Sequence, residues 1–329
     1  MPSHVTIKPS GHEFTVEDND SLLQGGLKSG LKLDYGCSNG ACGLCGAKVL
    51  SGEVKETGHA DFHFPEAERA EGMILMCAHR AASPEVVLET VEAGEAADIP
   101  LQEIPIKVKK LEQVSADLMI LRAKTPRTRR LRFLAGQYAT LELDGLSGDC
   151  ALASCPCDDM NLEFHIPRCP GFGFFERVFS GLKANTTINL EGPKGNFVLR
   201  QESGRSPVFI AGGAGFAPVK SLIEHAMSLE SYKTIRLYRA LSPEGGDYLE
   251  NLCRSWADAM DEVSYVPFRG NDPGGLMEMV AADVDLAFVD VYVAGPEELL
   301  KAAEGALVDA GLARARLYLE PVRRCPAAG

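Results

Sequence analysis

The sequence predicts three domains in series: a small α+β domain at residues 1–95, a six-stranded antiparallel β-barrel at 103–204, and an α/β domain with a parallel sheet at 205–324. Three observations support this division. A chain of 329 residues seldom folds around one hydrophobic core. Residues 92–100 are small, acidic and interrupted by proline, as expected of a linker. After residue 204, strands alternate with helical stretches, which is typical of parallel sheets with crossover helices.

The first domain opens with alternating apolar and polar residues. Residues 5–8 and 12–16 alternate on either side of a Pro-Ser-Gly turn, which predicts a β-hairpin. Asp20 or Ser21 is placed to cap a short helix that ends near Gly30. Further elements are expected as strands at 47–50 and 86–91 and as a short acidic helix at 65–70.

Four cysteines of this domain have an informative spacing. Cys37, Cys42 and Cys45 lie in one loop in the pattern C-x4-C-x2-C, and Cys77 follows after a long gap, as in plant-type [2Fe-2S] sites. Interleaved glycines let the backbone approach a cluster and donate N–H groups to sulfur. Scattered buried thiols would not produce this pattern, and zinc ligands more often come as two short-spaced pairs. The loop resembles that of plant-type ferredoxin domains, and the resemblance implies that these four cysteines ligate iron.

The barrel and the parallel sheet are predicted from their strand patterns. Short strand-like runs with turns between them, typical of a closed antiparallel barrel, occupy 104–108, 117–123, 137–143, 151–154, 162–166 and 187–190, with one helix at 174–182 and a turn at 192–195. The parallel strands are expected at 208–211, 235–238, 263–266, 291–294 and 316–319, and the helices at 219–229, 248–260 and 297–310.

Glycine-rich turns mark a candidate nucleotide site. The turn from Gly212 to Pro218 follows the first parallel strand and opens a helix, where backbone N–H groups and the helix dipole favour a phosphate. Glycine turns also serve packing, but this position favours dinucleotide binding. A second strand-to-helix turn occurs in the same sheet. The candidate cofactor-binding residues are Gly212, Gly213, Gly215, Pro218, Gly295 and Pro296.

Three runs together resemble the ferredoxin-NAD(P)H reductase family: 133–138 (FLAGQY), 191–197 (EGPKGNF) and 211–218 (AGGAGFAP). The resemblance covers nearly the whole chain, especially to members with an N-terminal ferredoxin domain, such as the reductases of ring-hydroxylating oxygenases and of CDP-6-deoxyhexulose dehydration. It implies a β-grasp-like ferredoxin domain, a flavin-binding barrel and a nicotinamide-binding domain. In that family a hydride passes from NAD(P)H to FAD, and electrons leave singly through the [2Fe-2S] cluster.

The flavin-side positions depart from that family. Its Arg-x-Tyr-Ser run corresponds here to Gly148, Asp149, Cys150 and Ala151, so the arginine, the ring and the hydroxyl are replaced. Its pyrophosphate Ser or Thr is Phe175, its Cys before Gly295 is Ala294, and its terminal aromatic is Val322. A pyrophosphate loses charge-assisted hydrogen bonds without the arginine. These departures put FAD binding in doubt, whereas the fold is expected to persist.

The same region is rich in cysteine. Cys150, Cys155, Cys157 and Cys169 fall within twenty residues, and four thiolates are what an iron–sulfur cluster or a zinc ion requires. They define a hypothetical second cluster in the vacated flavin pocket; the alternatives are buried apolar thiols or drift of a degenerate site. His165 is expected to be hydrogen-bonded structure rather than a ligand, and the nearby phenylalanines are expected to be core.

The amino-acid composition limits the classes of function that are expected. Lys and Arg number 33 against 46 acidic residues, which argues against nucleic-acid binding and allows docking to a basic redox partner. No segment resembles a leader or a membrane span, so a cytoplasmic protein is expected. Ten cysteines in that compartment suit ligands or reduced thiols.

The sequence therefore predicts an electron-transfer oxidoreductase that feeds a partner oxygenase or other redox enzyme through its [2Fe-2S] cluster. Two alternatives stay open: a conventional FAD-dependent NAD(P)H reductase, and a non-catalytic docking or regulatory subunit with the same fold.

Overall fold

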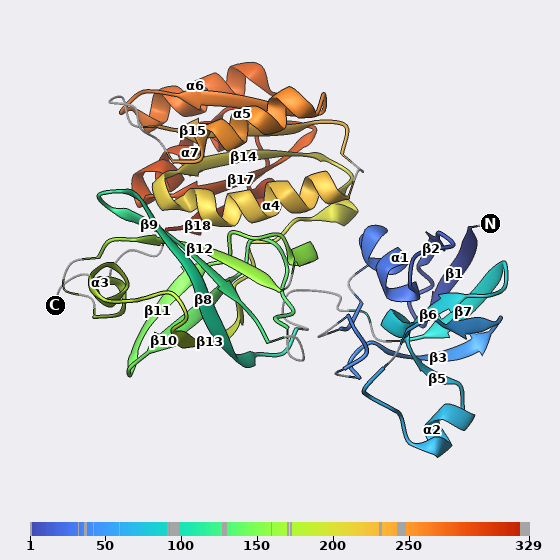
Figure 1. Ribbon diagram of the computed structural model, residues 1–329. Helices are drawn as coiled ribbons and strands as arrows, with labels where there is room; N and C mark the ends of the chain where they lie inside the picture. Colours follow the sequence, from blue (N-terminus) through green and yellow to red (C-terminus); the bar gives the residue numbers. More distant parts are fainter. Residues whose placement is uncertain are drawn as a thin grey trace. The chain divides into compact units, whose positions relative to one another are not determined.

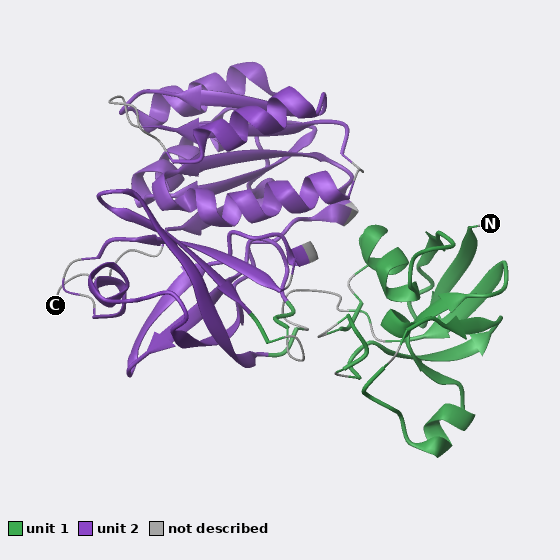
Figure 2. Ribbon diagram, viewed as in Figure 1, with its two compact units in different colours: residues 1–100, 125–132 green, residues 101–124, 133–329 purple. Residues whose placement is uncertain are grey.

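The chain forms two compact units. The computed structural model describes residues 2–31, 33–35, 38–41, 43–58, 60–90, 92, 99–126, 130–158, 160–169, 171, 173–229, 232–241 and 248–322, without the side chains of Cys157 and Glu202. One unit comprises residues 1–100 and 125–132, and the other comprises residues 101–124 and 133–329 (Figure 2).

The first unit is built on a mixed sheet with the strand order β2-β1-β7-β3-β5. Its strands are β1 (Ser3–Lys8), β2 (Glu13–Val16), β3 (Gly46–Ser51), β5 (Met73–Leu75) and β7 (Glu85–Glu89), with a separate pair β4 (Val54–Glu56) and β6 (His79–Ala81). Helix α1 (Leu22–Lys28) begins with the predicted cap: the Ser21 hydroxyl accepts from the Gln24 N–H, and the Gln24 side chain accepts from the Ser21 N–H. The acidic helix α2 (Glu66–Ala70) is also present.

A curled antiparallel six-stranded sheet opens the second unit, in the order β11-β10-β13-β8-β9-β12 (Figure 1). Its elements are β8 (Gln102–Ser115), β9 (Leu118–Lys124), β10 (Tyr138–Leu143), β11 (Leu146–Ala151), β12 (Asn161–Pro167), β13 (Thr187–Lys194) and helix α3 (Gly173–Ser180). A bridge between Leu152 and Phe164 joins the end of β11 to β12. The two edge strands of the sheet, β11 and β12, therefore meet, as the prediction of a closed barrel required.

The prediction of a strand at 151–154 was wrong. Strand β11 spans Leu146–Ala151 and pairs with β10 through a two-residue turn, because Leu143 lies opposite Leu146. The turn residues Asp144 and Gly145 both have positive φ, at 54° and 78°. Asp-Gly is a strong signal for such a hairpin. The predicted turn at 192–195 also proved shorter, since β13 continues to Lys194.

The parallel sheet has the order β16-β15-β14-β17-β18. Its strands are β14 (Ser206–Gly212), β15 (Ile235–Ala240), β16 (Val263–Phe268), β17 (Val289–Gly295) and β18 (Leu317–Pro321), and its helices are α4 (Phe216–Ser228), α5 (Glu250–Ala259), α6 (Pro273–Asp283) and α7 (Glu297–Asp309). Helices α4 and α5 contribute to one core cluster, and α6 and α7 to another. Helix α6 was not predicted from the sequence, although Asp272 caps it and Pro273 opens it.

Within the described residues, no helix combines the length and the apolar character needed to span a membrane.

Candidate functional site

The cysteine loop of the first unit brings two of its predicted ligands together. Cys45 immediately precedes β3, and Cys77 lies in a short 3-10 turn at Met76–Ala78. The Met76 N–H donates to the Cys45 carbonyl at 2.9 Å, which ties the two segments. Cys45 is buried and Cys77 is half-buried. Cys37 and Cys42 lie outside the described residues, so their predicted role stays a prediction.

The electrostatics at Cys77 suit an anionic sulfur. A hydrogen bond from Cys45, helped by the Gly40 backbone and opposed by burial, lowers the pKa of Cys77 to about 7. Gly40 and Gly43 have φ of 82° and 80°, and a Cβ at Gly43 would lie 2.6 Å from the Phe62 ring. The loop thus requires glycine for both its conformation and its packing. Sulfur that favours its charged form, with N–H donors beside it, fits a [2Fe-2S] cluster.

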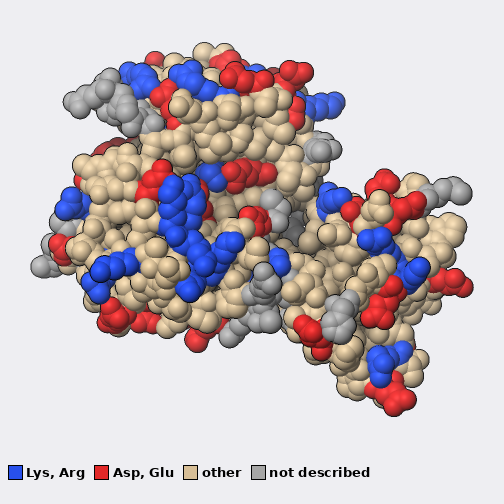
Figure 3. Space-filling model, in the orientation of Figure 1, with Lys and Arg blue, Asp and Glu red and all other residues tan. Residues whose placement is uncertain are grey.

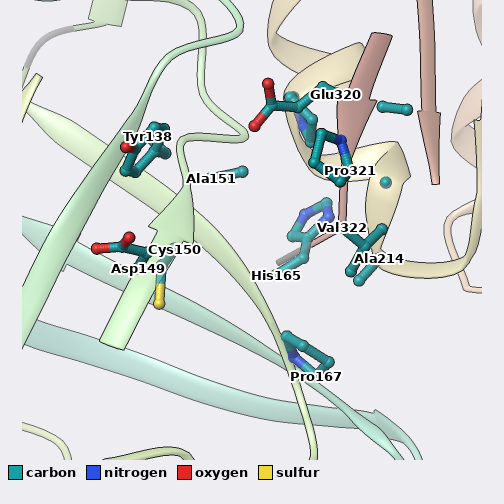
Figure 4. Close-up of a pocket in the computed structure, with 13 residues that line it drawn as sticks. Tyr138, Asp149, Cys150, Ala151, His165, Pro167, Ala214, Glu320, Pro321 and Val322 are labelled. Atoms are coloured by element: carbon teal, nitrogen blue, oxygen red, sulfur yellow. The ribbon is translucent and has the colours of Figure 1, made fainter. Parts of the chain in front are cut away.

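A pocket of about 420 Å³ lies between the barrel and the carboxyl ends of the parallel strands (Figure 4). We call it the barrel pocket. Strands β10, β11 and β12 contribute Tyr138, Asp149 and His165 to its lining, and β18 contributes Glu320. No Lys or Arg is among the described residues that line it, whereas two carboxylates are. An anionic pyrophosphate therefore has no cationic partner on these walls.

Two phenylalanine rings occupy the space beside Gly148. A Cβ at Gly148 would lie 2.7 Å from Cδ1 of Phe174 and 2.9 Å from Cε2 of Phe175. Both rings are buried at the start of α3, which confirms their expected place in the core. The family's arginine would have no room here. The barrel pocket therefore does not fit FAD by the contacts that the resemblance implies.

The four-thiolate arrangement is not seen in the described part of the chain. Cys150 is a buried free thiol whose Sγ donates to the Gly148 carbonyl at 3.7 Å, and burial raises its pKa. Cys155 and Cys169 are each disulfide-bonded. The side chain of Cys157 lies outside the description. No group of three or more His, Cys, Asp or Glu side chains in the described ranges is placed to hold a metal ion.

His165 belongs to a buried hydrogen-bond network. Its Nε2 lies 2.9 Å from Glu163 Oε1, and its Nδ1 lies 3.4 Å from the Tyr248 hydroxyl. Burial lowers the pKa of His165, so a neutral ring donates Nε2–H to the carboxylate. Burial alone would raise the pKa of Glu163, but the hydrogen bond from His165 and the charges of Lys220 and Arg122 lower it to about 2. His165 thus has the structural role expected of it.

The six predicted nucleotide-site residues separate into two groups. Gly212, Gly213 and Pro296 line a second pocket of about 530 Å³ at the carboxyl ends of β14 and β17, together with Asp272 at the start of α6. We call it the sheet-edge pocket. Gly215 and Pro218 instead line the barrel pocket. The division follows from the glycine turn, which ends one strand and begins α4 between the two pockets.

Gly295 lines neither pocket, but it connects the end of β17 to the residue that follows β18. Its carbonyl accepts from the Val322 N–H at 2.9 Å. A Cβ at Gly215 would lie 2.3 Å from the Ala294 carbonyl oxygen, so the glycine turn packs directly on the end of β17. The place of Asp272 in the sheet-edge pocket was not predicted, although the Asp-Pro-Gly signal for a capped helix marks this position.

A ferredoxin-like cysteine loop joined to a curled antiparallel barrel and a parallel nucleotide-type sheet defines an iron–sulfur electron-transfer reductase. Residues 5–82 match the 2Fe-2S iron-sulfur cluster binding domain, and residues 105–199 match the oxidoreductase FAD-binding domain.

Relatives match over almost the whole chain. The CDP-6-deoxy-L-threo-D-glycero-4-hexulose-3-dehydrase reductase of Yersinia pseudotuberculosis is 30% identical over 97% of this chain and 98% of its own length. The phenol 2-monooxygenase reductase component DmpP of Pseudomonas sp. is 28% identical over 97% and 94% of the two chains. The crystal structure of the Amycolatopsis cytochrome P450 reductase GcoB has a TM-score of 0.61, 24% identity and coverage of 97% and 98%.

The chain therefore belongs to the ferredoxin-NAD(P)H reductase family, in the group with an N-terminal [2Fe-2S] domain. This confirms the predicted resemblance, fold class and electron-transfer function. The match to an FAD-binding domain counts against the expectation that FAD binding is doubtful.

Proposed function

We propose that the chain passes single electrons to a separate redox protein through a [2Fe-2S] cluster held by Cys37, Cys42, Cys45 and Cys77. The observation that carries this proposal is the pairing of Cys45 with Cys77, where the pKa of Cys77 falls to about 7 in a loop with N–H donors. Relatives named as reductases of a sugar dehydrase and of monooxygenases support a partner enzyme of either kind. Reduced cysteine ligands suit the reducing cytoplasm.

The electron donor is proposed to be a reduced nicotinamide dinucleotide at the sheet-edge pocket. In open α/β sheets such ligands bind outside the carboxyl ends of the strands, and Gly212, Gly213 and Pro296 line the pocket there. A hydride donor needs a two-electron acceptor before the one-electron cluster. FAD is the acceptor that the family match favours. Because the barrel pocket does not fit FAD by the usual contacts, we assign no residue to its pyrophosphate.

A second candidate replaces FAD with a cysteine-held cluster. Cys155 and Cys169, which follow β11 and β12, are both buried, but each is disulfide-bonded, so each would have to be reduced before it could ligate iron. Such a site would exchange electrons one at a time, so its donor would be another protein rather than a hydride.

Cofactor counting on anaerobically purified full-length protein tests these proposals. We expect about two iron and two sulfide ions per chain, with the spectrum of a plant-type cluster. Flavin released by denaturation at about one per chain would exclude the second candidate. Iron and sulfide well above two per chain without flavin would exclude FAD. Absence of iron would overturn the main proposal, and a reducible cluster that reduces no partner would indicate a docking or regulatory subunit.

A further inference from the structure

The Tyr248 hydroxyl lies between residues that line the two pockets of the second unit. It is 3.1 Å from the carbonyl oxygen of Gly213, which lines the sheet-edge pocket, and 3.4 Å from Nδ1 of His165, which lines the barrel pocket. Ala214, the next residue of the glycine turn, lines the barrel pocket with His165 (Figure 4). One hydroxyl therefore contacts a wall of each pocket.

Two rings and one cation hold the Tyr248 ring in place. Its centroid lies 5.3 Å from that of His165 and 6.0 Å from that of Phe216, and both pairs are edge-on. Arg239 is buried, has its Cζ 5.3 Å from the centre of the Tyr248 ring and donates to the Tyr248 carbonyl at 2.9 Å. A hydroxyl in such surroundings needs a hydrogen-bond partner. Because the ring is held, its hydroxyl depends on the two acceptors beside it.

The Tyr248 hydroxyl has one proton for these two acceptors. A neutral His165 ring donates Nε2–H to Glu163, so Nδ1 carries only a lone pair. The hydroxyl then divides its proton between Nδ1 and the Gly213 carbonyl. A protonated ring has N–H groups on both nitrogens. Its Nδ1–H donates to the Tyr248 oxygen, which leaves the hydroxyl proton for Gly213 alone.

The bond to Gly213 matters because this part of the glycine turn is not fixed by packing. Gly213 is exposed, has φ of 53°, and a Cβ added there would meet nothing within 4 Å. A Cβ at Gly215, by contrast, would lie 2.3 Å from the Ala294 carbonyl oxygen. Backbone with few packing contacts opens more readily. A stronger bond from Tyr248 therefore holds this wall of the sheet-edge pocket in place.

The charged groups around His165 come from several elements. They are Glu163 on β12, Arg122 on β9, Lys220 and Glu224 on α4, Arg239 on β15, Asp149 on β11 and Glu320 on β18. Figure 3 shows Lys and Arg side chains gathered over β8 and β9, and from β9 Arg122 bonds Glu163 at 2.7 Å. The pKa of Glu163 is about 2, so this carboxylate stays ionised near neutrality.

Two groups of this network have pKa values shifted toward mildly acidic pH. Burial lowers the pKa of His165, and burial raises the pKa of Glu224, which bonds Lys220 at 2.7 Å. Burial also raises the pKa of the Tyr248 hydroxyl, which therefore stays a donor. A test of His165 must accordingly separate its titration from that of Glu224.

We propose that Tyr248 is a positioning residue that transmits the protonation state of His165 at the barrel pocket to the glycine turn at the sheet-edge pocket. Protonation of His165 fixes the turn and tightens dinucleotide binding. Negative charge in the barrel pocket favours the protonated ring, so the charge in one pocket is coupled to binding in the other. This inference rests on the proposed binding of a nicotinamide dinucleotide at the sheet-edge pocket and adds how that binding is regulated.

Calorimetric titration of full-length protein with NAD⁺ tests the proposal, because NAD⁺ cannot donate a hydride during the measurement. The test variant Tyr248→Phe removes only the hydroxyl. The matched control is Tyr265→Phe, since that hydroxyl is buried on β16 and has no hydrogen-bond partner among the described residues. Between about pH 7.5 and about pH 5.5, we expect the NAD⁺ affinity of wild type and control to rise roughly fivefold and that of Tyr248→Phe to stay constant.

Proton uptake gives a second measurement. By linkage, NAD⁺ binding draws protons onto His165 near its pKa, and calorimetry in two buffers of different ionisation enthalpy measures this uptake. We expect it in wild type and in Tyr265→Phe. We expect none in Tyr248→Phe or in His165→Gln, which keeps a donor for Glu163 but cannot titrate.

The outcomes separate this inference from the proposed function. Equal pH dependence in wild type and Tyr248→Phe would overturn the inference and leave the dinucleotide site in place. Proton uptake that persists in His165→Gln would assign the titration to Glu224 and would also overturn it, even if Tyr248→Phe failed to fold. No NAD⁺ binding by wild type at any pH would overturn the proposed dinucleotide site and this inference together.

Discussion

The cysteine loop and the barrel pocket differ in how much of the chemistry expected of each is present. The loop has the complete ligand spacing, and its described part holds Cys77 in an environment that favours the thiolate. The barrel pocket has the right backbone, but its walls carry Asp149 and Glu320 and no cation among the described residues. A fold thus preserves the position of a site more readily than the side chains that a given cofactor needs.

The largest expected effect is at the loop. Cys77→Ser should abolish the visible spectrum of the [2Fe-2S] cluster and lower electron transfer to a partner by roughly two orders of magnitude, since a ligand is lost. Cys253→Ser is the control, because Cys253 is a buried thiol in α5, which belongs to the other unit. A C77S protein with full iron content would break the contrast between the two regions.

The next largest effect is expected in the glycine turn between β14 and α4, where an added methyl group would overlap with neighbouring backbone atoms. Gly215→Ala places a methyl 2.3 Å from the Ala294 carbonyl oxygen, so backbone must move. We expect a loss of roughly 3 kcal/mol in the free energy of unfolding. Because the displaced turn also carries Gly212 and Gly213 of the sheet-edge pocket, we expect weaker NADH binding as well. Gly213→Ala is the comparison: it meets nothing within 4 Å but has φ of 53°, so roughly 1 kcal/mol is expected. Thermal denaturation and NADH titration measure both; equal effects would contradict the packing argument.

The buried hydrogen-bond network of His165 and Glu163 is expected to make the stability of the second unit depend on pH. The pKa of Glu163 is about 2 in the fold against 4.5 for an unperturbed glutamate, so its stabilisation is present above pH 4.5 and is lost as pH falls toward 2. Glu163→Gln should cost roughly 3 kcal/mol at pH 7, with the gap to wild type closing over that window. Exposed Glu278→Gln on α6 is the control. Parallel stability curves for wild type and E163Q between pH 5 and 2 would contradict this assignment.

The smallest effect tests the barrel pocket directly. Gly148→Arg alone should destabilise by roughly 2 kcal/mol, because Phe174 and Phe175 fill the space. Gly148→Arg/Phe175→Ser removes one ring and restores two polar partners, so FAD should bind roughly tenfold tighter than in wild type. Flavin fluorescence titration of wild type and both variants measures this. Equal FAD affinity in all three proteins would show that these positions do not control flavin binding.

Much of the fold could be predicted because its signals are local. The continuous apolar run in β14 and the Ser21 cap need only their neighbours in sequence. The exact position of β11 was missed, although Asp144 and Gly145 signal its turn. The cluster loop was predictable from spacing alone.

The rest of the site depends on contacts between distant segments. Nothing near Gly148 in sequence shows that two rings from α3 fill its side-chain space. The division of Gly212 and Gly215 between two pockets depends on how the turn crosses β17. The contacts of Tyr248 with His165 and Gly213 join three separate stretches of the chain. The candidate positions could therefore be predicted from the sequence, whereas the side chains that contact them could not.

The packing of Phe174 and Phe175 on Gly148 also bears on how this protein can change over generations. An arginine introduced first meets the rings, and a serine introduced first at position 175 leaves a hole with nothing to bind. Each step alone is harmful and only the pair is useful, which is sign epistasis. Because both rings pack against the glycine, we expect a conventional flavin pocket to require the two changes together rather than either single mutation.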